Sequence, residues 1–479
     1  MTSNRTRPAA VPNVFDNRAD IQAIVATGFN SLKSARFLLL QVTNRSAAQK
    51  WLRDVLHAGL VANVPAVGDA LRQGHLRAAV SIAMTHEGLI EAGVRPSSTH
   101  PFPSTFADGM GNLLHRKKLG DTQAPADWRW TDTSRAAGPQ TFVAHWLAAC
   151  YWDGQRGSDH PLLQAPALRA AGFRVEEIPA DPAFIQKDGS AIEPFGFRDG
   201  IAQPVVDGLR GGQSKRHRHI HNSARPQARD HLIAPGEFVL GYPNEYGDLA
   251  YAPDSAAGAP LRASGSPRFA ANGSYVAVRQ IVQDVKGLRA FEAEHAAAVG
   301  GGPASPSIVE RMVGRYRDGR PLGLPDRAKP DFDDFRYQMY DAQGFGCPRG
   351  AHVRRANPRD LLGVDPTTGR PDTRLHRLLR RGRSYVLDSG EQGLFFMALN
   401  ADLDRQFAFV QGQWIQQSTF GDLADEADPL LGTSHRNFTA QCPLLAQRLT
   451  QLPRFTRLVG GGYFFLPGLS ALGEIAASG

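Results

Sequence analysis

A single histidine stands in a segment whose composition suits a ligand to haem iron. In residues 346–358, His352 lies between small residues and two arginines, Arg354 and Arg355. Small neighbours leave room for a flat macrocycle to approach an imidazole, and fixed positive charge nearby can neutralise haem propionates. In an arbitrary loop, such a histidine is more often structural. Here the small residues and arginines favour a ligand to haem iron.

Four motifs, in the same order as in the family, resemble those of the dye-decolorizing peroxidases. The sequence G-x-x-D-G occurs at residues 196–200, and the segment around His352 matches C-P-x-G-A-H-x-R-R-x-N-P-R. Residues 378–385 are similar to the family's distal arginine stretch, and residues 393–407 to the strand and helix that close its haem pocket. The resemblance runs from about residue 20 to residue 467, and the chain length indicates the longer, insertion-rich bacterial branch.

This resemblance implies a haem b peroxidase with one haem per chain. Such an enzyme uses hydrogen peroxide to oxidise aromatic dyes and phenolic donors through an oxoferryl intermediate. His352 is then the axial iron ligand, Asp199 the distal acid-base residue and Arg380 the distal cation. Arg355 is expected to pair with a haem propionate. The alternative is a haem-binding carrier or iron-handling protein without turnover, which has no use for Asp199 and Arg380.

The residue types at the two distal positions agree with this chemistry. Asp199 belongs to an Asp-Gly pair, which by itself often marks a turn, but Gly196 and Gly200 would let the backbone approach a flat ligand closely. A planar, permanently charged guanidinium at Arg380 can hydrogen-bond peroxide and keep a nearby carboxylate ionised. Arg381 is the alternative, because several arginines crowd this stretch and residues 364–369 resemble an inserted turn.

Further side chains are expected around the haem. An imidazole that binds iron needs an acceptor for its far nitrogen, and Asp402 is the nominated acceptor, with Asp404 as the second choice. Asp402 also stands where a helix should begin, so N-capping alone would explain it. Leu394 and Phe396 alternate on a predicted strand and are expected to face the peroxide side together, although core packing is an equally good explanation.

Composition describes a globular protein with a sizeable core. Of the 479 residues, 42% are hydrophobic and 21% are charged, and no apolar run is long enough to span a bilayer. The polar amino terminus lacks a hydrophobic signal core and paired arginines, so we expect a cytoplasmic protein. The three cysteines lack the spacing of a zinc or redox site, and no C-x-x-C-H is present. We therefore expect reduced thiols and a non-covalently held haem.

Charge and histidine patterning do not indicate another function. The net charge of +8 is spread over the chain without a recognised nucleic-acid-binding motif, so we expect neither nucleic-acid nor membrane partners. The alternating histidines of residues 216–221 lie among arginines that would repel a cation, which favours a solvated loop. The expected partners are hydrogen peroxide and aromatic small-molecule reductants. A homo-oligomer is left open.

Strand and helix patterns alternate in both halves of the chain. The first half suggests strands at residues 36–42, 78–84 and 141–151, with a helix over 46–56 that Ser46 caps and a short one that Thr85 caps. The second half suggests strands at 274–281 and 394–399 and helices over 284–299 and 402–414. The pattern predicts an α+β fold of duplicated ferredoxin-like halves with antiparallel sheets, at residues 20–205 and 236–470, joined by an insertion over 206–235. The haem is expected between the sheet and helices of the second half.

Overall fold

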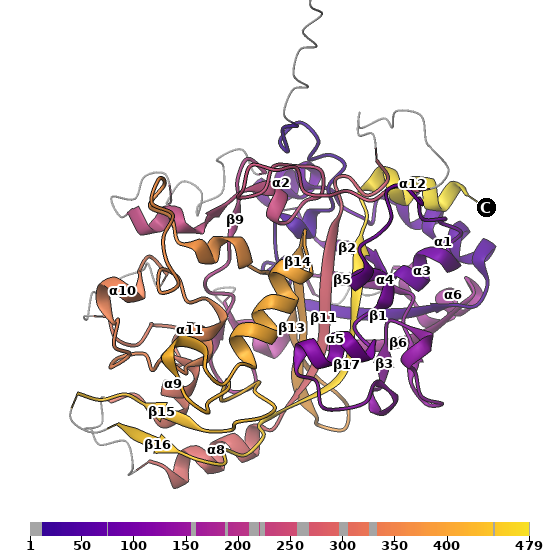
Figure 1. The fold of residues 1–479 in the computed structure, drawn as a ribbon. Coiled ribbons are helices and arrows are strands. Elements are labelled where there is room, and N and C mark those ends of the chain that lie inside the picture. Colours follow the sequence, from indigo (N-terminus) through magenta and orange to yellow (C-terminus); the bar gives the residue numbers. More distant parts are fainter. Residues whose placement is uncertain are drawn as a thin grey trace, which may run out of the picture.

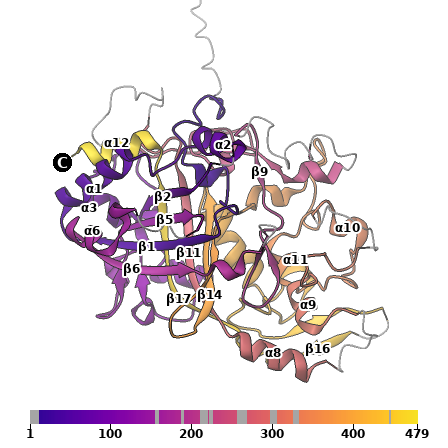
Figure 2. The same ribbon diagram turned by 180° about the vertical axis from the view of Figure 1, so that it is seen from behind.

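A large, mainly antiparallel β-sheet organises the chain. The computed structural model describes residues 12–73, 75–154, 160–186, 190–209, 220, 226–255, 268–296, 305–324, 333–443 and 446–478. Its main sheet has 11 strands, most of which fall into two groups that run at a steep angle to each other (Figures 1 and 2). The α+β class predicted from the sequence is confirmed. Among the described residues, no helix combines the length and apolar character needed to cross a membrane.

The two groups of strands share one spatial order. The N-terminal group has the order β6 (Phe173–Ala180), β1 (Ser34–Val42), β5 (Trp146–Trp152), β2 (Ala78–Met84). The C-terminal group has the order β17 (Thr456–Leu466), β11 (Ser274–Gln283), β14 (Gln392–Asn400), β13 (Arg383–Val386), and the short β12 (Leu379–Arg380) also pairs with β14. In each group the first strand along the chain lies between the fourth and the third. All neighbours within the groups are antiparallel.

Single pairs of residues join the groups at both edges. Tyr385 of β13 pairs with Ala180 of β6, and Phe465 of β17 pairs with Met84 of β2. The sheet continues past β17 through the short strands β3 (Trp130–Thr131) and β4 (Phe142–Val143). The remaining described strands form three small pairs: β7 (Ala191–Ile192) with β8 (Arg198–Asp199), β9 (Val205–Val206) with β10 (Leu232–Ile233), and β15 (Phe438–Ala440) with β16 (Gln447–Leu449).

Helices lie on both sides of the strands. On the side of the N-terminal group are α1 (Arg45–His57), α2 (Val64–Arg72), α3 (His86–Glu91), α4 (Ser104–Asp108), α5 (Leu113–Leu119), α6 (Ala165–Ala170) and α12 (Leu469–Ala477), which packs on α1. On the other side, at the left of Figure 1, are α8 (Val285–Glu294), α9 (Ile308–Val313), α10 (Tyr337–Tyr340) and α11 (His352–Ala356). Two π-helical turns, η10 (Asp404–Ala408) and η11 (Val410–Ile415), follow β14.

Most predicted elements are present, with corrections at their ends. The predicted cap Ser46 is wrong: the side chain of Asn44 accepts the backbone N–H of Ala47, so the helix begins earlier. Thr85 does cap α3, through the N–H of Gly88. The strand predicted over 141–151 is two strands, β4 and β5, and the helix predicted from residue 284 ends at Glu294. The helix predicted over 402–414 is wound mainly as π-helix.

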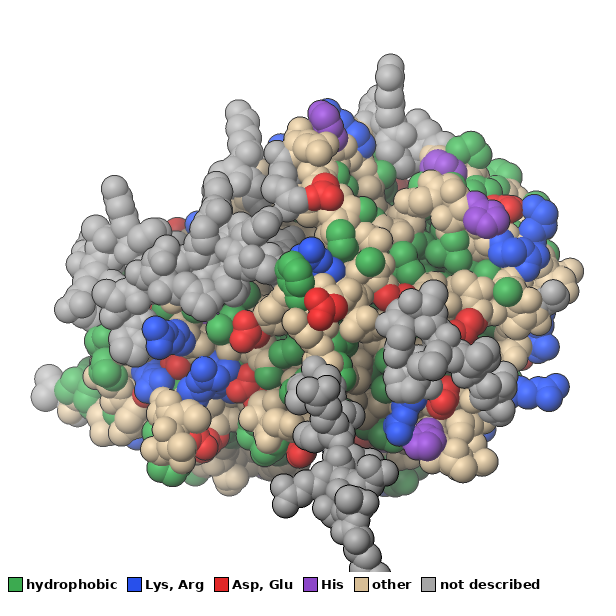
Figure 3. Space-filling view, turned by 90° about the horizontal axis from the view of Figure 1, so that it is seen from above, with side chains coloured by type: hydrophobic (Ala, Val, Ile, Leu, Met, Phe, Trp, Pro, Cys, Tyr) green, Lys and Arg blue, Asp and Glu red, His purple; other side chains and the backbone are tan. Residues whose placement is uncertain are grey.

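The division into residues 20–205, 206–235 and 236–470 stays a prediction. The histidine-rich motif of residues 216–221 lies outside the described residues except for Ile220, as does much of the expected insertion. On the face in Figure 3, acidic, basic and apolar side chains are interspersed where they are coloured by type.

Alternating side chains of β1 build the core on both faces of the sheet. Leu38 and Leu40 enter one buried cluster, and Phe37 and Leu39 enter the other. Phe37 stacks on Phe395 of β14, with ring centroids 4.3 Å apart and planes 20° apart. This contact joins the two groups of strands at their centre, since both rings are fully buried.

Removing this stack should destabilise the fold. We expect Phe395→Ala to lower the free energy of unfolding by about 3–5 kcal/mol, through lost burial and an unfilled cavity. Leu114→Ala removes an apolar side chain that is 74% exposed and should cost less than about 0.5 kcal/mol. Urea unfolding followed by tryptophan fluorescence measures both. Equal midpoints for the two variants would contradict the central role of the stack.

Candidate active site

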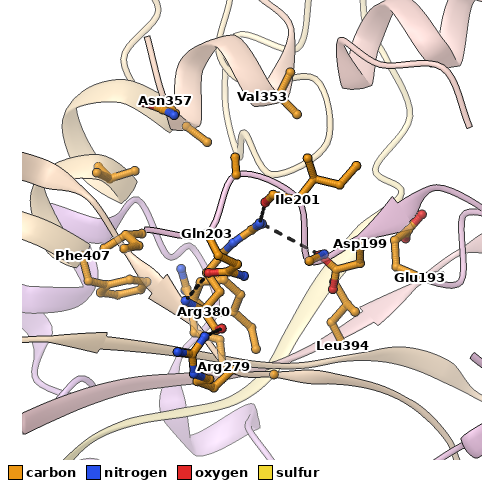
Figure 4. Close-up of a pocket in the computed structure, with 18 of the residues that line it drawn as sticks. Glu193, Asp199, Ile201, Gln203, Arg279, Val353, Asn357, Arg380, Leu394 and Phe407 are labelled. Atoms are coloured by element: carbon orange, nitrogen blue, oxygen red, sulfur yellow. Dashed lines mark hydrogen bonds and ion pairs between the residues drawn. The ribbon is translucent and has the colours of Figure 1, made fainter. Parts of the chain in front are cut away.

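A cavity of about 1550 Å³ opens between the C-terminal group of strands and the helical segments α11 and η11. It exceeds the roughly 300–1,000 Å³ that usually holds a drug-sized ligand. Its floor includes β11, β12 and β14, and the segment from β7 to β9 forms a further wall. Figure 4 shows Val353 of α11, and Asn357 directly after this helix, across this space from Arg380 and Asp199. The cavity therefore has room for a ligand as large as a macrocycle.

His352 begins α11 and lines the cavity. The loop before it is fixed by Asp341, whose carboxylate accepts the backbone N–H groups of Gly346 and Cys347. Arg354 then donates to the carbonyl oxygen of Cys347 and pairs with Asp341. These contacts hold the start of α11 in place, so the position of His352 depends on local hydrogen bonds rather than on a long helix.

Asp428 orients the imidazole of His352. Its Oδ2 lies 2.9 Å from His352 Nδ1, and its Oδ1 accepts the backbone N–H groups of Leu430 and Leu431. The Asp428 side chain is fully buried, whereas that of His352 is 26% exposed. His352 Nε2 has no hydrogen-bond partner among the described residues, so this nitrogen is available to a ligand. A neutral imidazole with Nδ1–H donated to a carboxylate is the form that binds metals.

Burial alone would raise the pKa of the Asp428 carboxyl. The facing His352, the backbone N–H of Leu431 and the charge of Arg355 outweigh burial and lower this pKa overall. The carboxylate is therefore ionised at neutral pH and can polarise the imidazole.

The prediction that Asp402 accepts from His352 is wrong. The Asp402 carboxylate accepts the backbone N–H of Arg405, which is the capping role weighed against it in the sequence. The second choice, Asp404, pairs with Lys118 and Thr105 instead. Asp428 lies 76 positions beyond His352 in a stretch without a recognised motif, so no sequence signal identified it.

Arg355 does not line the cavity, so its predicted role at a propionate is wrong. Its guanidinium is fully buried and donates to the carbonyl oxygens of Trp414, Gln417 and Glu426. Burial lowers its pKa. Arg355 therefore ties α11 to the end of η11 and to the loop that carries Asp428, and its contribution to the site is indirect.

Asp199 and Arg380 meet at the cavity wall. Asp199 ends β8, its Oδ1 accepts the backbone N–H of Gly200 at 2.6 Å, and Arg380 Nη1 lies 4.0 Å from this oxygen. The two side chains are 35% and 36% exposed. Arg380 also donates to the carbonyl oxygen of Ile201, and its backbone N–H bonds Gln203 (Figure 4). These contacts support the choice of Arg380 over Arg381 as the distal cation, because Arg381 instead donates to the carbonyl oxygens of Ile24 and Val25.

Leu394 and Phe396 line the cavity, while their place on the peroxide side stays a prediction. Both line the cavity from β14 and alternate with Phe395 and Met397, which are buried in the core on the other face. Gly200 lines the cavity with φ +76°, in the left-handed region that favours glycine. Side chains that were assigned no individual role in the pocket from the sequence complete the wall: Phe407, Val410 and Trp414 of the π-helical turns, Arg279 and Gln283 of β11, and Asn357 and Glu193.

These residues fit a haem. An imidazole with one nitrogen fixed and the other available faces a cavity whose walls combine apolar side chains with several arginines. Haem iron needs the imidazole as a ligand, the macrocycle needs apolar walls, and the propionates need positive charge. Since Arg355 does not line the cavity, positive charge near the propionates would have to come from other arginines of the cavity wall.

Comparison with known proteins agrees with this fold. No family model matches the chain. It is 28% identical over 412 residues to the multifunctional dye peroxidase DyP2 of an Amycolatopsis species, covering 76% of this chain and 81% of that protein. It is 26% identical over 491 residues to the dye-decolorizing peroxidase AauDyP1 of Auricularia auricula-judae, covering 95% of this chain and 86% of that protein. The crystal structure of a DyP-type peroxidase from an Anabaena species superposes with a TM-score of 0.73 at 20% identity, covering 99% and 100% of the two chains.

The fold is thus that of the DyP-type peroxidases, one of whose solved members is bacterial. The curated relatives are named dye peroxidases and dye-decolorizing peroxidases, so the predicted resemblance to that family is confirmed. It is therefore an enzyme of the oxidoreductase class.

The role of Asp428 can be tested against that of Asp402. We expect Asp428→Asn to weaken haem binding by about 10- to 100-fold, because an amide polarises and orients the imidazole less well than a carboxylate. Asp402→Asn is the matched control and should bind haem like the unmodified chain. Titration of haem-free protein with haemin, followed by Soret absorbance, measures both affinities. The reverse order of the two effects would restore Asp402 as the partner of His352.

Proposed function

We propose that the protein is a haem b peroxidase, with one haem per chain, that uses hydrogen peroxide to oxidise aromatic dyes or phenolic donors. The observation that carries this proposal is the meeting of three groups at one cavity: His352 with its available Nε2, Asp199, and Arg380. The names of the relatives, which describe dye peroxidases, support the class of reducing substrate.

In this proposal the haem lies between the C-terminal group of strands and the segments α11 and η11. His352 Nε2 binds the iron, and Asp428 keeps the imidazole in the required tautomer through Nδ1. Leu394, Phe396 and Phe407 contact the macrocycle from the walls. When bound, the haem would supply an iron and a porphyrin that together can take up the two oxidising equivalents of hydrogen peroxide.

The polar residues move the proton. The ionised Asp199 accepts a proton from one oxygen of hydrogen peroxide and returns it to the other oxygen, which leaves as water. Arg380 donates hydrogen bonds to the peroxide and stabilises the negative charge that develops as the O–O bond breaks. The 4.0 Å between Arg380 Nη1 and Asp199 Oδ1 lets both side chains contact one small molecule.

The finer architecture is proposed with the function. We propose that the two groups of strands are ferredoxin-like halves, at residues 20–205 and 236–470, with an insertion over 206–235. Their shared spatial order of strands supports this division. A carrier without turnover is the competing function, but the paired Asp199 and Arg380 favour the peroxidase. The cytoplasmic location stays a prediction.

Variants of the proton-transfer pair test the proposed function. Asp199→Asn and Arg380→Leu should keep the resting Soret band while slowing the peroxide-dependent spectral change by about 10²- to 10⁴-fold, the usual contribution of general acid-base catalysis. Arg370→Leu removes an exposed arginine and should react like the unmodified protein. Rapid mixing of each haem-loaded protein with hydrogen peroxide measures the rate. A protein that binds haem but whose Soret band is unchanged by peroxide would be a carrier.

A further inference from the structure

A tight turn presents Asp199 to the cavity. It joins β7 to β8, in which Ala191 pairs with Asp199 and Ile192 with Arg198. The backbone N–H of Glu193 donates to the carbonyl oxygen of Phe197, and that of Gly196 donates to the carbonyl oxygen of Glu193. Gly196 has φ +93°, and a side chain there would approach Arg317 to 3.0 Å. The geometry of this turn therefore determines where Asp199 lies.

The side chain of Glu193 closes the turn from inside. Its Oε1 accepts the backbone N–H of Phe197 at 2.9 Å, and its Oε2 accepts the N–H of Phe195 at 3.0 Å. Its Oε2 also accepts Nε2 of Gln283, the last residue of β11, at 2.7 Å. One carboxylate thus joins both arms of the turn to the floor of the cavity.

The hydrogen bonds indicate the charge state of Glu193. All three partners are N–H donors, and a protonated carboxyl would direct its own hydrogen at one of them. Burial raises the pKa of Glu193 above its ordinary value, and the nearby Asp199 adds to this, while the three hydrogen bonds act in the opposite direction. The three donors favour the ionised form of Glu193, and its raised pKa means that it takes up a proton in milder acid than an exposed glutamate does.

Other contacts hold the rest of the turn independently. Phe195 and Phe197 are buried in a cluster with Phe291 of α8 and Met312 of α9. Arg317 donates to the carbonyl oxygen of Phe195 at 2.5 Å and pairs with Glu292 at 2.6 Å. These contacts secure the rings and one carbonyl group, whereas the inner N–H groups of the turn depend on Glu193.

We propose that Glu193 is the positioning residue for Asp199: its ionised carboxylate closes the turn that presents Asp199 to Arg380 and ties this turn to β11. The inference rests on the proposed function, because positioning matters only where Asp199 transfers a proton. No hydrogen bond joins the side chains of Asp199 and Glu193 in the part of the chain that the structure describes, so Glu193 acts through the backbone between them.

A pH dependence follows with a definite sign. As the pH falls through the raised pKa of Glu193, its carboxyl gains a proton, one N–H loses its acceptor and the turn loosens. The charged groups around it are Asp199 on β8, which faces Arg380 of β12, and Arg317 beyond α9. Asp284, next to Gln283, accepts the N–H of Gly287 at the start of α8. We therefore expect the peroxide step to slow on the acid side because Glu193 becomes protonated.

Hydrogen exchange in the haem-free protein tests the turn without any catalysis. Glu193→Gln should speed amide exchange in the peptide that spans residues 193–199 by about tenfold, since an amide cannot accept all three N–H groups. Glu292→Gln is the matched control, because Glu292 touches the same turn only through Arg317. It should leave exchange of the Phe195 and Phe197 N–H groups close to that of the unmodified protein. Unchanged exchange in Glu193→Gln would overturn the proposal.

Rapid mixing with peroxide then tests the link to Asp199. Glu193→Gln should slow the peroxide step by about 10- to 100-fold at neutral pH, as expected for a displaced catalytic group, and its acid limb should move to lower pH. Glu193→Asp keeps a carboxylate, so the acid limb of its pH–rate profile should lie closer to that of the unmodified protein.

Two outcomes would overturn the inference: an unaltered rate in Glu193→Gln, or a slower rate with an unaltered acid limb. If the unmodified protein failed to bind haem, the proposed function would fail instead. The exchange experiment would still report on the turn in that case.

Discussion

The hydrogen bond between Asp428 and His352 is the interaction on which the site depends. A fully buried carboxylate is costly unless it is compensated, and Asp428 is compensated by two backbone N–H groups and the imidazole. Removing the imidazole would leave one oxygen without its partner, and removing the carboxylate would free the imidazole to rotate. The two residues therefore fix each other, and the available Nε2 of His352 is a consequence of this pairing.

The rest of the fold brings a second set of polar groups to the same cavity. β14 supplies apolar side chains to the floor through its alternating pattern, and β12 pairs with β14 so that Arg380 stands beside them. The turn that Glu193 closes brings Asp199 to Arg380 from the opposite direction. Arg380 thus lies on a strand of the main sheet, and Asp199 lies at the end of a turn that the hydrogen bonds of Glu193 hold closed. This arrangement suits a reaction that needs both groups held at one small molecule.

The motifs near each functional side chain were readable from the sequence, whereas long-range partners were not. His352, Asp199 and Arg380 lie at one cavity as the resemblance implied, and Leu394 and Phe396 follow from strand alternation. Asp428 was missed because its contact with His352 spans 76 positions, and an aspartate before a proline has many local explanations. Asp402 was misassigned for the converse reason, since its capping role is local and complete.

Arg355 shows how a matching motif can mislead about direction. Residues 352, 353, 356 and 357 line the cavity, and at about 100° per residue these positions share one face of a helix. Residues 354 and 355 lie on the opposite face and reach into the protein, where both are buried. The motif gives the distance of Arg355 from His352 along the chain. It does not show which face of α11 carries Arg355, because that depends on how α11 packs against η11. The π-helical winding after β14 was likewise invisible in a pattern that predicts an ordinary helix.

The most direct test of the account is a crystal structure of the haem-loaded protein with anomalous data collected at the iron edge. The account predicts one iron peak in the cavity, bound by Nε2 of His352 while Nδ1 keeps its contact with Asp428, and Asp199 and Arg380 on the opposite face of the haem. Iron bound to any other side chain, or a haem outside this cavity with the Asp428–His352 pair unaltered, would contradict it.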